Sequence, residues 1–368
     1  MPIPYFILYK LLYIAAGIGG ISGLIFFHEL GHFLFCKLFN IATPSFSIGV
    51  GPELFSRTIG KTRFIIAAIP LGGYVEIAGM INDMDPTKAV DAPDKASSFI
   101  YKPFYQKLFV LLGGIIFNII FAYAIFSVVH FVGTPASPLL YYETAIPVIK
   151  EIVGNSPAQK AGLLAGDRIT AVDTIPLEST ESPFTKLIPG QQKYYSFSIV
   201  RGTESLTINI SPDETAKSLG IMFATQSRPG LPFIQAIKQG ITTTNRWIYQ
   251  TAKGLFHLFK QRDFSQTAGP IKIISMITQS ASDGFIIYIV LLAIISINLA
   301  LFNLLPAPIL DGGQMLICLI EALFGRQLPL KAREYLFITT WLIFLILIVY
   351  LSFKDLGILR IIAARFNG

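Results

Sequence analysis

Four long runs of apolar residues dominate the chain. They cover roughly residues 8–36, 107–132, 284–305 and 335–353. The hydrocarbon core of a bilayer is about 30 Å thick and is crossed by a helix of about 20 residues, so each run is long enough to span it. The pattern predicts a polytopic α-helical membrane protein with about four transmembrane helices.

Composition agrees with a membrane protein and excludes one class of partner. Of the 368 residues, 53% are hydrophobic and 14% are charged, and the net charge is +7. The basic residues are spread over loops and the flanks of the apolar runs. They do not form the dense Lys/Arg block with interleaved aromatics that is typical of nucleic-acid binding. We therefore expect the lipid bilayer, and no nucleic acid, as the partner of this charge.

The basic residues also predict an orientation. With four spans, residues 37–106 and 306–334 lie on the same side of the membrane. Both segments carry several Lys and Arg, and the positive-inside rule assigns their side to the cytoplasm. The basic C-terminal tail, with Lys354, Arg360 and Arg365, lies on the opposite side and argues against this assignment.

Between the second and third apolar runs, the sequence has the composition of a soluble domain. A strand near residues 147–153, a short helix after Ser156-Pro157, a turn at Gly166-Asp167 and a second strand are expected in that order. This order resembles the core of a PDZ domain, and an unrelated small α/β domain is the alternative. Residues 218–221 are a weak candidate for a loop that captures a peptide carboxylate.

Residues 233–262 repeat apolar positions at helical spacing among basic ones. This predicts one or two amphipathic helices on the membrane surface, or a helix packed on the soluble domain. The expected organisation is a first membrane half (1–133), a PDZ-like extracytoplasmic domain (134–230), an amphipathic helical linker (231–283) and a second membrane half (284–368).

Residues 28–32 read His-Glu-Leu-Gly-His inside the first apolar run. On a helix, His28 and His32 are one turn apart on the same face, which is the spacing of two zinc ligands, and Glu29 beside them is placed to act as a general base. Ionisable side chains at membrane depth are costly and mark functional sites. A pair of histidines packed in the core of a helix bundle is the alternative.

A catalytic zinc usually has three protein ligands and an open position, so a third ligand is expected. Asp311 follows the third apolar run in the segment Asn303-Leu304-Leu305-Pro306-Ala307-Pro308-Ile309-Leu310-Asp311-Gly312-Gly313. Because the first and third spans run in the same direction, Asp311 should reach the depth of the histidines. The alternative is an exit loop whose aspartate caps the next helix.

Three asparagines lie in or beside the apolar runs. Asn303 could donate a hydrogen bond to a substrate carbonyl or to the oxyanion, or could satisfy backbone groups freed by the two prolines. We interpret Asn118 and Asn298 as helix-packing residues, because an amide can form hydrogen bonds across closely packed helices.

Taken together, these motifs resemble the site-2 protease family of intramembrane zinc metalloproteases, and most of all its bacterial regulator-of-sigma-E protease type. The motifs are His28-Glu29-x-x-His32, Gly113-Gly114-x-x-x-Asn118, one PDZ-like insert and Asn303-x-x-Pro-x-Pro-x-Leu-Asp311-Gly. The resemblance extends over nearly the whole chain. The best-studied members carry two tandem PDZ domains, whereas this chain has room for one.

The resemblance implies one Zn²⁺ held by His28, His32 and Asp311, with Glu29 activating the water. It implies cleavage of transmembrane segments in single-span membrane proteins or remnant signal peptides, in the bacterial inner (cytoplasmic) membrane and toward its cytoplasmic side. A catalytically silent, PDZ-bearing scaffold that binds peptides is the alternative function. The sequence leaves the oligomeric state open.

Residues 62–78 contain two β-rich runs around Pro70 and the Gly72-Gly73 pair, which predict a hairpin. Members of the family that the chain resembles place such a loop beside the zinc. We therefore expect Leu71, Gly72 and Gly73, together with Asn303, to bind substrate, with the hairpin edge accepting it as an added strand. A sheet that only supports the first span is the alternative.

Overall fold

The computed structural model describes residues 3–82, 85–173, 175–178, 183, 194–211, 219–261 and 267–357. The chain divides into two compact units. The first, here called the membrane unit, comprises Met1–Val128 and Ile237–Gly368, and the second, the inserted unit, comprises Val129–Ala236. The boundaries fall within helices α2 (Phe104–Val132) and α5 (Phe233–Gln261). The four-part division expected from the sequence stays a prediction.

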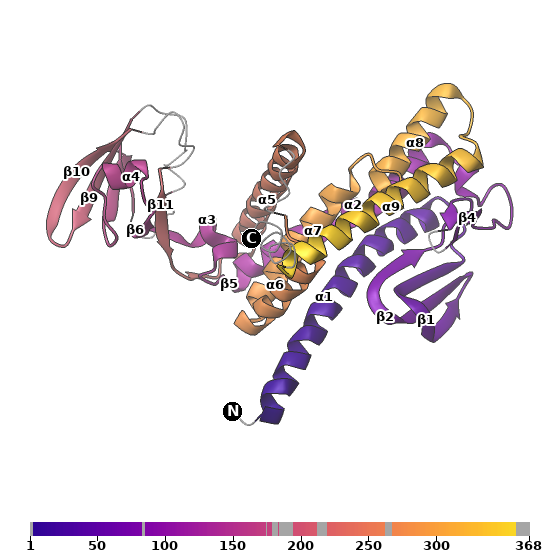
Figure 1. Ribbon diagram of the computed structural model, residues 1–368, viewed down its shortest axis with the longest axis horizontal. Helices are drawn as coiled ribbons and strands as arrows, with labels where there is room; N and C mark the ends of the chain where they lie inside the picture. Colours follow the sequence, from indigo (N-terminus) through magenta and orange to yellow (C-terminus); the bar gives the residue numbers. More distant parts are fainter. Residues whose placement is uncertain are drawn as a thin grey trace, which may run out of the picture. The chain divides into compact units, whose positions relative to one another are not determined.

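Four helices in the described part of the chain are long and apolar enough to cross a bilayer (Figure 1). They are α1 (Ile3–Leu38), α2, α7 (Phe285–Asn303) and α9 (Leu330–Asp355). An α-helix satisfies its own backbone hydrogen bonds, which is the condition for exposing a chain to lipid. The four spans predicted from the apolar runs are confirmed.

Glycines let α1 and α2 pack backbone to backbone. A Cβ atom at Gly31 would overlap the carbonyl group of Gly113, and a Cβ at Gly113 would lie 2.6 Å from the carbonyl oxygen of Gly31. Small residues at such crossings allow the close approach on which helix association in lipid depends. The glycine pair of the second apolar run therefore holds α2 against the histidine-bearing part of α1.

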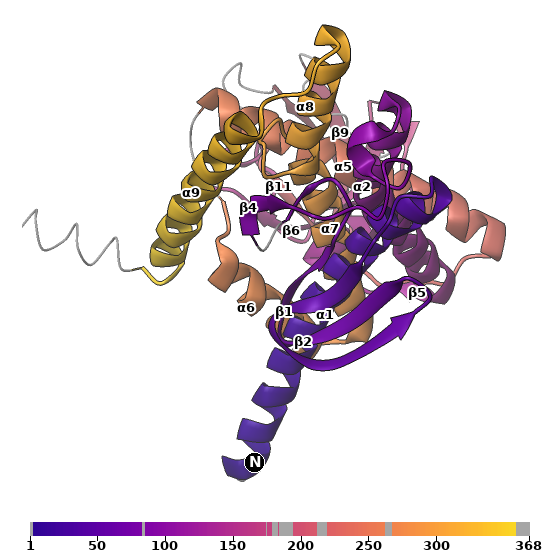
Figure 2. The same cartoon turned by 90° about the vertical axis from the view of Figure 1, so that its right-hand side faces the viewer.

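Strands β1 (Ser45–Ile59) and β2 (Thr62–Val75) form a sheet that packs against α1 (Figures 1 and 2). Residues 55–59 pair with residues 66–62, and residues 46–48 pair with residues 75–73. The hairpin turn thus lies at Gly60-Lys61, and the hairpin expected around Pro70 is wrong in the position of its turn. Both β-rich runs of residues 62–78 pair with β1 and not with each other, a long-range pairing that local composition does not specify.

Shorter elements complete the membrane unit. Strand β4 (Asp85–Ala89) pairs with β3 (Ile81–Asn82) and packs against α9 (Figure 2). Helix α6 (Pro270–Asp283) packs against α1, α7 and α9, and α8 (Asp311–Phe324) lies between α7 and α9 in the chain. A short 3-10 helix, η1 (Phe99–Tyr101), precedes α2.

Helix α5 is one continuous amphipathic helix. Thr251 Oγ1 donates to Asn298 Oδ1 of α7 over 2.8 Å, and Tyr123 Oη of α2 donates to Asn245 Oδ1 over 2.5 Å. Side chains such as Phe256 on the same helix are exposed. The helix is therefore tied to two spans by polar contacts, and its lying on a membrane surface stays a prediction.

The inserted unit is built on a six-stranded sheet in the order β10-β9-β7-β6-β11, with β8 paired to β7. Its core is a cluster of buried apolar side chains that includes Ile149, Ile169 and Phe197. The five longer strands are β6 (Ala145–Ile152), β7 (Arg168–Val172), β9 (Tyr195–Arg201), β10 (Glu204–Ile210) and β11 (Ile221–Thr225). The shorter elements are β5 (Gly133–Thr134), η2 (Pro138–Leu140), α3 (Tyr141–Thr144), α4 (Pro157–Lys160), β8 (Ile175–Pro176) and β12 (Arg228–Pro229).

Strand β6, helix α4 and strand β7 follow in the order that the sequence predicted for a PDZ core, and the PDZ identity itself stays a prediction. In the candidate carboxylate loop, Ser218 lies outside the described residues. The carbonyl oxygens of Leu219 and Gly220 accept backbone N–H groups from Ala158 and Val153, over 3.1 and 2.9 Å. These two carbonyl groups are therefore engaged within the fold.

Candidate metal centre and its cavity

Helix α1 presents two buried histidines on one face. The Nε2 atoms of His28 and His32 are 3.2 Å apart. Gly114 of α2 faces them, and a Cβ atom at that position would lie 2.5 Å from both His28 Cε1 and His32 Nε2. The absence of a side chain at position 114 leaves the space that the two imidazole rings occupy.

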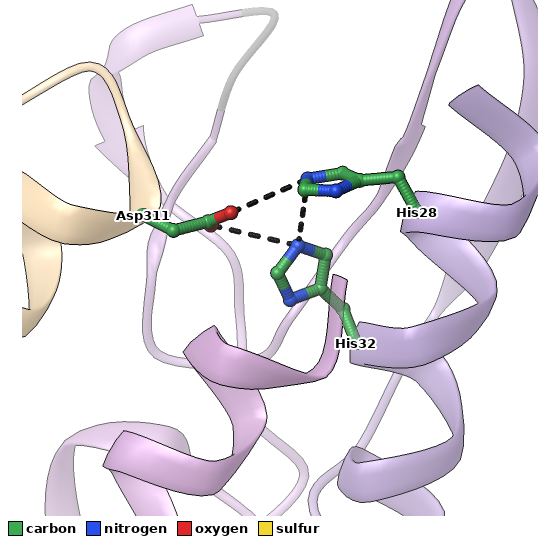
Figure 3. A group of neighbouring side chains, drawn as sticks. All are labelled: His28, His32 and Asp311. Atoms are coloured by element: carbon green, nitrogen blue, oxygen red, sulfur yellow. Dashed lines mark hydrogen bonds and ion pairs between the residues drawn. The ribbon is translucent and has the colours of Figure 1, made fainter. Parts of the chain in front are cut away.

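Asp311 reaches the histidines from the break between α7 and α8. Helix α7 ends at Asn303, and Asp311 is the first residue of α8. Its Oδ2 lies 3.3 Å from His28 Nε2 and its Oδ1 lies 3.5 Å from His32 Nε2, and Figure 3 shows the three side chains pointing toward one another. Leu310 holds the N-cap position, and no side chain caps the helix. The aspartate therefore does not have the capping role considered as its alternative.

Two glycines fold the break tightly enough to aim the carboxylate. A Cβ atom at Gly312 would overlap the backbone of Leu304, and one at Gly313 would overlap the backbone of Ala307. Any larger residue would push α8 away from the end of α7. The Asp-Gly-Gly sequence thus combines a potential metal ligand with the close packing that positions it.

The donor set fits a tetrahedral zinc ion. Zinc bonds to nitrogen and oxygen of about 2.0–2.2 Å place two tetrahedral ligands about 3.3–3.6 Å apart. The Nε2 atoms of His28 and His32 are 3.2 Å apart, and each lies 3.3 or 3.5 Å from one of the two carboxylate oxygens of Asp311. One potential ligand atom from each residue lies within 4.8 Å of the other two. Asp311 Oδ2 is buried without a hydrogen-bond partner, which a bound cation would satisfy.

A second layer of contacts surrounds the histidines. His32 Nδ1 lies 2.8 Å from the carbonyl oxygen of Val110, and His28 Nδ1 lies 3.2 Å from Asn118 Nδ2. At the nitrogen of His28 that faces Asp311, Asn303 Nδ2 lies 3.3 Å from Nε2. Such contacts orient ligands and set which nitrogen carries the hydrogen.

A cavity of about 340 Å³ is lined by His28, His32, Asp311 and Asn303, together with Glu29. One wall is formed by Gly73, Tyr74, Val75 and Glu76, at the end of β2 and just beyond it. A Cβ atom at Gly73 would lie 3.8 Å from Cγ of Glu29, so the strand runs directly past the glutamate. The cavity therefore brings together three potential metal ligands, a carboxylate and a length of extended backbone.

Comparison with known proteins identifies the family. The model of peptidase family M50 matches residues 16–348, a range that contains His28, His32 and Asp311, all of α2 and α7, and most of α1 and α9. The chain belongs to peptidase family M50. Together with its four membrane-length helices, this membership makes it a multi-pass membrane protein.

Relatives of this M50 chain match it over most of their length. A Clostridium perfringens protein named as a candidate zinc metalloprotease is 30% identical over 350 residues, covering 94% of this chain and 98% of its own. One from Nostoc sp. with a name of the same kind is 32% identical over 359 residues, covering 93% and 95%. A chloroplast protein of Arabidopsis thaliana named as a candidate membrane metalloprotease is 31% identical over 354 residues, covering 91% and 78%.

Membership of family M50 confirms the prediction of a metalloprotease of the site-2 type. The relatives' names agree with zinc as its metal. The narrower likeness to the regulator-of-sigma-E type and the presence of a single PDZ domain stay predictions.

The structure gathers most of the residues that the sequence singled out. His28, Glu29, His32, Asn303, Asp311 and Gly73 all line the same cavity. Gly72 is not among the described residues that line it; it has φ +109, and a Cβ atom there would lie 3.3 Å from Val50 Cγ1. The side chain of Leu71 lies outside the described residues. The roles proposed for these residues stay predictions.

Sequence reasoning missed the place of Asn118 and Gly114 in this M50 site. Asn118 is fully buried and contacts His28, although it was interpreted as a packing residue. Asn298, interpreted in the same way, bonds to Thr251 and not to the site. The available signal was spacing, since Gly114 and Asn118 are four residues apart and therefore share one helix face.

Proposed function

We propose that this chain is a zinc-dependent intramembrane endopeptidase that hydrolyses transmembrane segments. The observation that carries the proposal is the convergence of His28, His32 and Asp311 with Glu29 in one cavity among membrane-length helices. The names of its relatives support zinc as the metal. A silent scaffold would have no need of this convergence.

The positions of these residues support the following catalytic roles. A zinc ion held by His28, His32 and Asp311 would lower the pKa of a water and polarise the scissile carbonyl. Glu29 accepts the proton of the attacking water and returns it to the leaving amine. The side-chain amide of Asn303, beside His28, donates a hydrogen bond to the carbonyl oxygen as negative charge develops on it.

The strand beside Glu29 suggests how an unwound substrate is held. The N–H of Glu76 donates to the carbonyl oxygen of Ser45 in β1 over 3.0 Å. Along an antiparallel strand, every second residue forms hydrogen bonds with the partner strand, and the residues between them direct their N–H and C=O groups to the other side. Gly73 and Val75 therefore direct their backbone groups away from β1, and no other described strand pairs with β2. We propose that the substrate backbone adds to this edge as a strand, which presents a peptide bond to Glu29.

The proposed substrates are single-span membrane proteins or remnant signal peptides in the bacterial inner membrane, with the site toward the cytoplasmic side. The positive charge of the loops on that side supports the orientation.

The test is cleavage of a model transmembrane peptide and of a signal peptide by the purified chain, with and without a chelator. We expect chelation to abolish cleavage of both and added Zn²⁺ to restore it. Glu29→Gln should retain zinc and lose at least about 100-fold in rate, the lower range for a general base. Glu151→Gln, an exposed carboxylate in the inserted unit, is the matched control. Near-normal cleavage by Glu29→Gln would overturn the proposal.

The strand-addition step has its own test on the substrate side. N-methylation removes one backbone N–H from the peptide without touching the enzyme. Because an added strand bonds through alternate residues, cleavage should be slowed by N-methylation at every second position near the scissile bond. Uniform tolerance of N-methylation, or sensitivity without alternation, would show that the edge does not hold the substrate.

A further inference from the structure

His28 and His32 are oriented by different groups of α2. His32 Nδ1 lies 2.8 Å from the carbonyl oxygen of Val110, and both are buried. A carbonyl oxygen can only accept a hydrogen bond, so Nδ1 of His32 carries the hydrogen and its Nε2 keeps a lone pair. The metal-facing nitrogen of His32 is thereby fixed by the main chain.

Among the described residues, the partner of His28 Nδ1 is not a main-chain carbonyl but the carboxamide of Asn118. For His28 Nε2 to bind a cation, Nδ1 must carry the hydrogen and needs an acceptor. In the structure it faces Asn118 Nδ2 at 3.2 Å, while Asn118 Oδ1 is buried without a hydrogen-bond partner. Turning the carboxamide by half a turn places Oδ1 against the Nδ1–H group, which satisfies both at once. The amide nitrogen and oxygen are nearly the same size, so the turn needs no repacking.

We propose that Asn118 is the positioning residue of His28: its side-chain oxygen accepts from Nδ1–H and thereby holds Nε2 as the metal-binding nitrogen. This inference rests on the proposed metal function and deepens it. Asn118 is placed for the role by its surroundings. It is fully buried, and its main-chain carbonyl oxygen accepts a hydrogen bond from Ser296 Oγ of α7 over 2.9 Å.

A role in helix packing predicts a different effect of replacing Asn118 than a role in positioning His28. Asn298 is an example of an asparagine that joins two helices, since its side-chain oxygen accepts a hydrogen bond from Thr251 Oγ1. If Asn118 only packed helices, its replacement would change stability and leave the affinity for zinc unchanged. If it positions His28, affinity changes with the hydrogen-bonding capacity at position 118 and not with its volume.

The experiment compares zinc affinity, by chelator competition, in the full-length wild-type chain and in Asn118→Leu, Asn118→Asp and Asn298→Leu. Leucine has a similar volume and accepts no hydrogen bond, so Asn118→Leu should bind zinc about 10–100-fold more weakly, as is usual when the partner of a ligand is lost. Aspartate accepts from Nδ1–H, so Asn118→Asp should keep wild-type affinity or exceed it. Asn298→Leu should be unchanged. Cobalt absorption spectra of the same variants report whether the ligand set stays tetrahedral, independently of activity.

The outcomes separate the two proposals. Equal zinc affinity in the wild type and Asn118→Leu overturns the positioning role and leaves the metal centre standing. A loss in Asn118→Leu that Asn118→Asp shares overturns it too, because hydrogen-bond acceptance is then not the property that matters. A wild-type chain that binds no zinc overturns the proposed function and this inference with it.

Discussion

At the scale of single residues, the site depends on glycines, which have no side chain, as much as on its polar side chains. The ligands alone are polar groups that cost free energy to bury. Gly114 admits the two imidazole rings, while Gly312 and Gly313 let the chain turn tightly enough to present Asp311. These glycines allow three potential metal ligands to meet in one place.

This gives a prediction for Gly114→Ala. The new Cβ would lie 2.5 Å from atoms of both histidines, whose rings can swing aside without unfolding the helices. The ligand atoms then lose their tetrahedral spacing, and zinc affinity should fall by about 10–100-fold, the usual result of disturbing ligand orientation. Zinc content after dialysis against a weak chelator measures the loss.

Gly19→Ala and Gly23→Ala on α1 are the controls, because a Cβ atom at either position would meet nothing within 4 Å. Both should retain full zinc content. Wild-type zinc content in Gly114→Ala would contradict the steric argument.

At the scale of elements, α9 is held to its neighbours by polar contacts at its two ends. Near its start, Arg333 pairs with Glu321 of α8, and both side chains are largely buried. At its other end, Asp355 accepts from the N–H groups of Gly269 and Lys272 over 3.2 and 2.9 Å, at the first turn of α6. No hydrophobic driving force acts between helices in lipid, so their association depends on close packing and on interhelical polar contacts such as these.

Asp355→Ala tests this contact. Helix α6 begins at Pro270 after Gly269, neither of which has a side chain that caps the helix, so Asp355 supplies the acceptors for its first turn. Its loss should cost about 0.5–2 kcal/mol, the range for removing a helix cap. Hydrogen exchange of the first turn of α6 in detergent should accelerate accordingly. Asp283→Ala, which removes an exposed carboxylate from the last turn of the same helix, should leave this exchange unchanged, and equal effects of the two variants would rule out a capping role.

At the scale of the whole molecule, the two units are stabilised by different kinds of contact. The membrane unit consists largely of apolar helices, whereas the inserted unit has a core of its own and a bidentate ion pair. In that pair, Arg201 donates to both oxygens of the buried Asp167 over 2.8 and 2.7 Å, and Leu164 N–H donates over 2.9 Å. Burial raises the pKa of Asp167, but these donors lower it by more, so the pKa lies below its usual range.

The inserted unit should therefore lose stability in acid. A carboxyl group whose pKa is lower in the folded state stabilises the fold above its unfolded pKa of about 3.9, and this stabilisation disappears as the pH falls through the folded-state pKa. Hydrogen exchange of β7 and β9 between pH 6 and pH 3, corrected for intrinsic rates, measures the loss. In Asp167→Asn the acid dependence should be weaker, and an unchanged dependence would assign it to other groups.

How much was predictable depends on the range of the interactions. The four spans and the helical spacing of His28 and His32 follow from local periodicity, and the structure has them where the sequence predicted. The pairing of β1 with β2 was misjudged around Pro70, because strand partners are chosen by distant residues and by packing on α1. The sequence did not indicate that Asn118 contacts His28, because the two residues are 90 positions apart in the chain.

The sequence by itself determined the membrane-spanning helices, the pair of histidines on one face of α1 and the expectation of a third ligand at Asp311. These depend on hydrophobic length, helical repeat and the direction of successive spans, which are properties of short segments. Only the tertiary structure decided which groups complete the site. The strand edge at Gly73 reaches Glu29, Gly114 makes room for the rings and Asn118 supports His28 because helices and strands from distant parts of the chain pack closely enough for single atoms to meet.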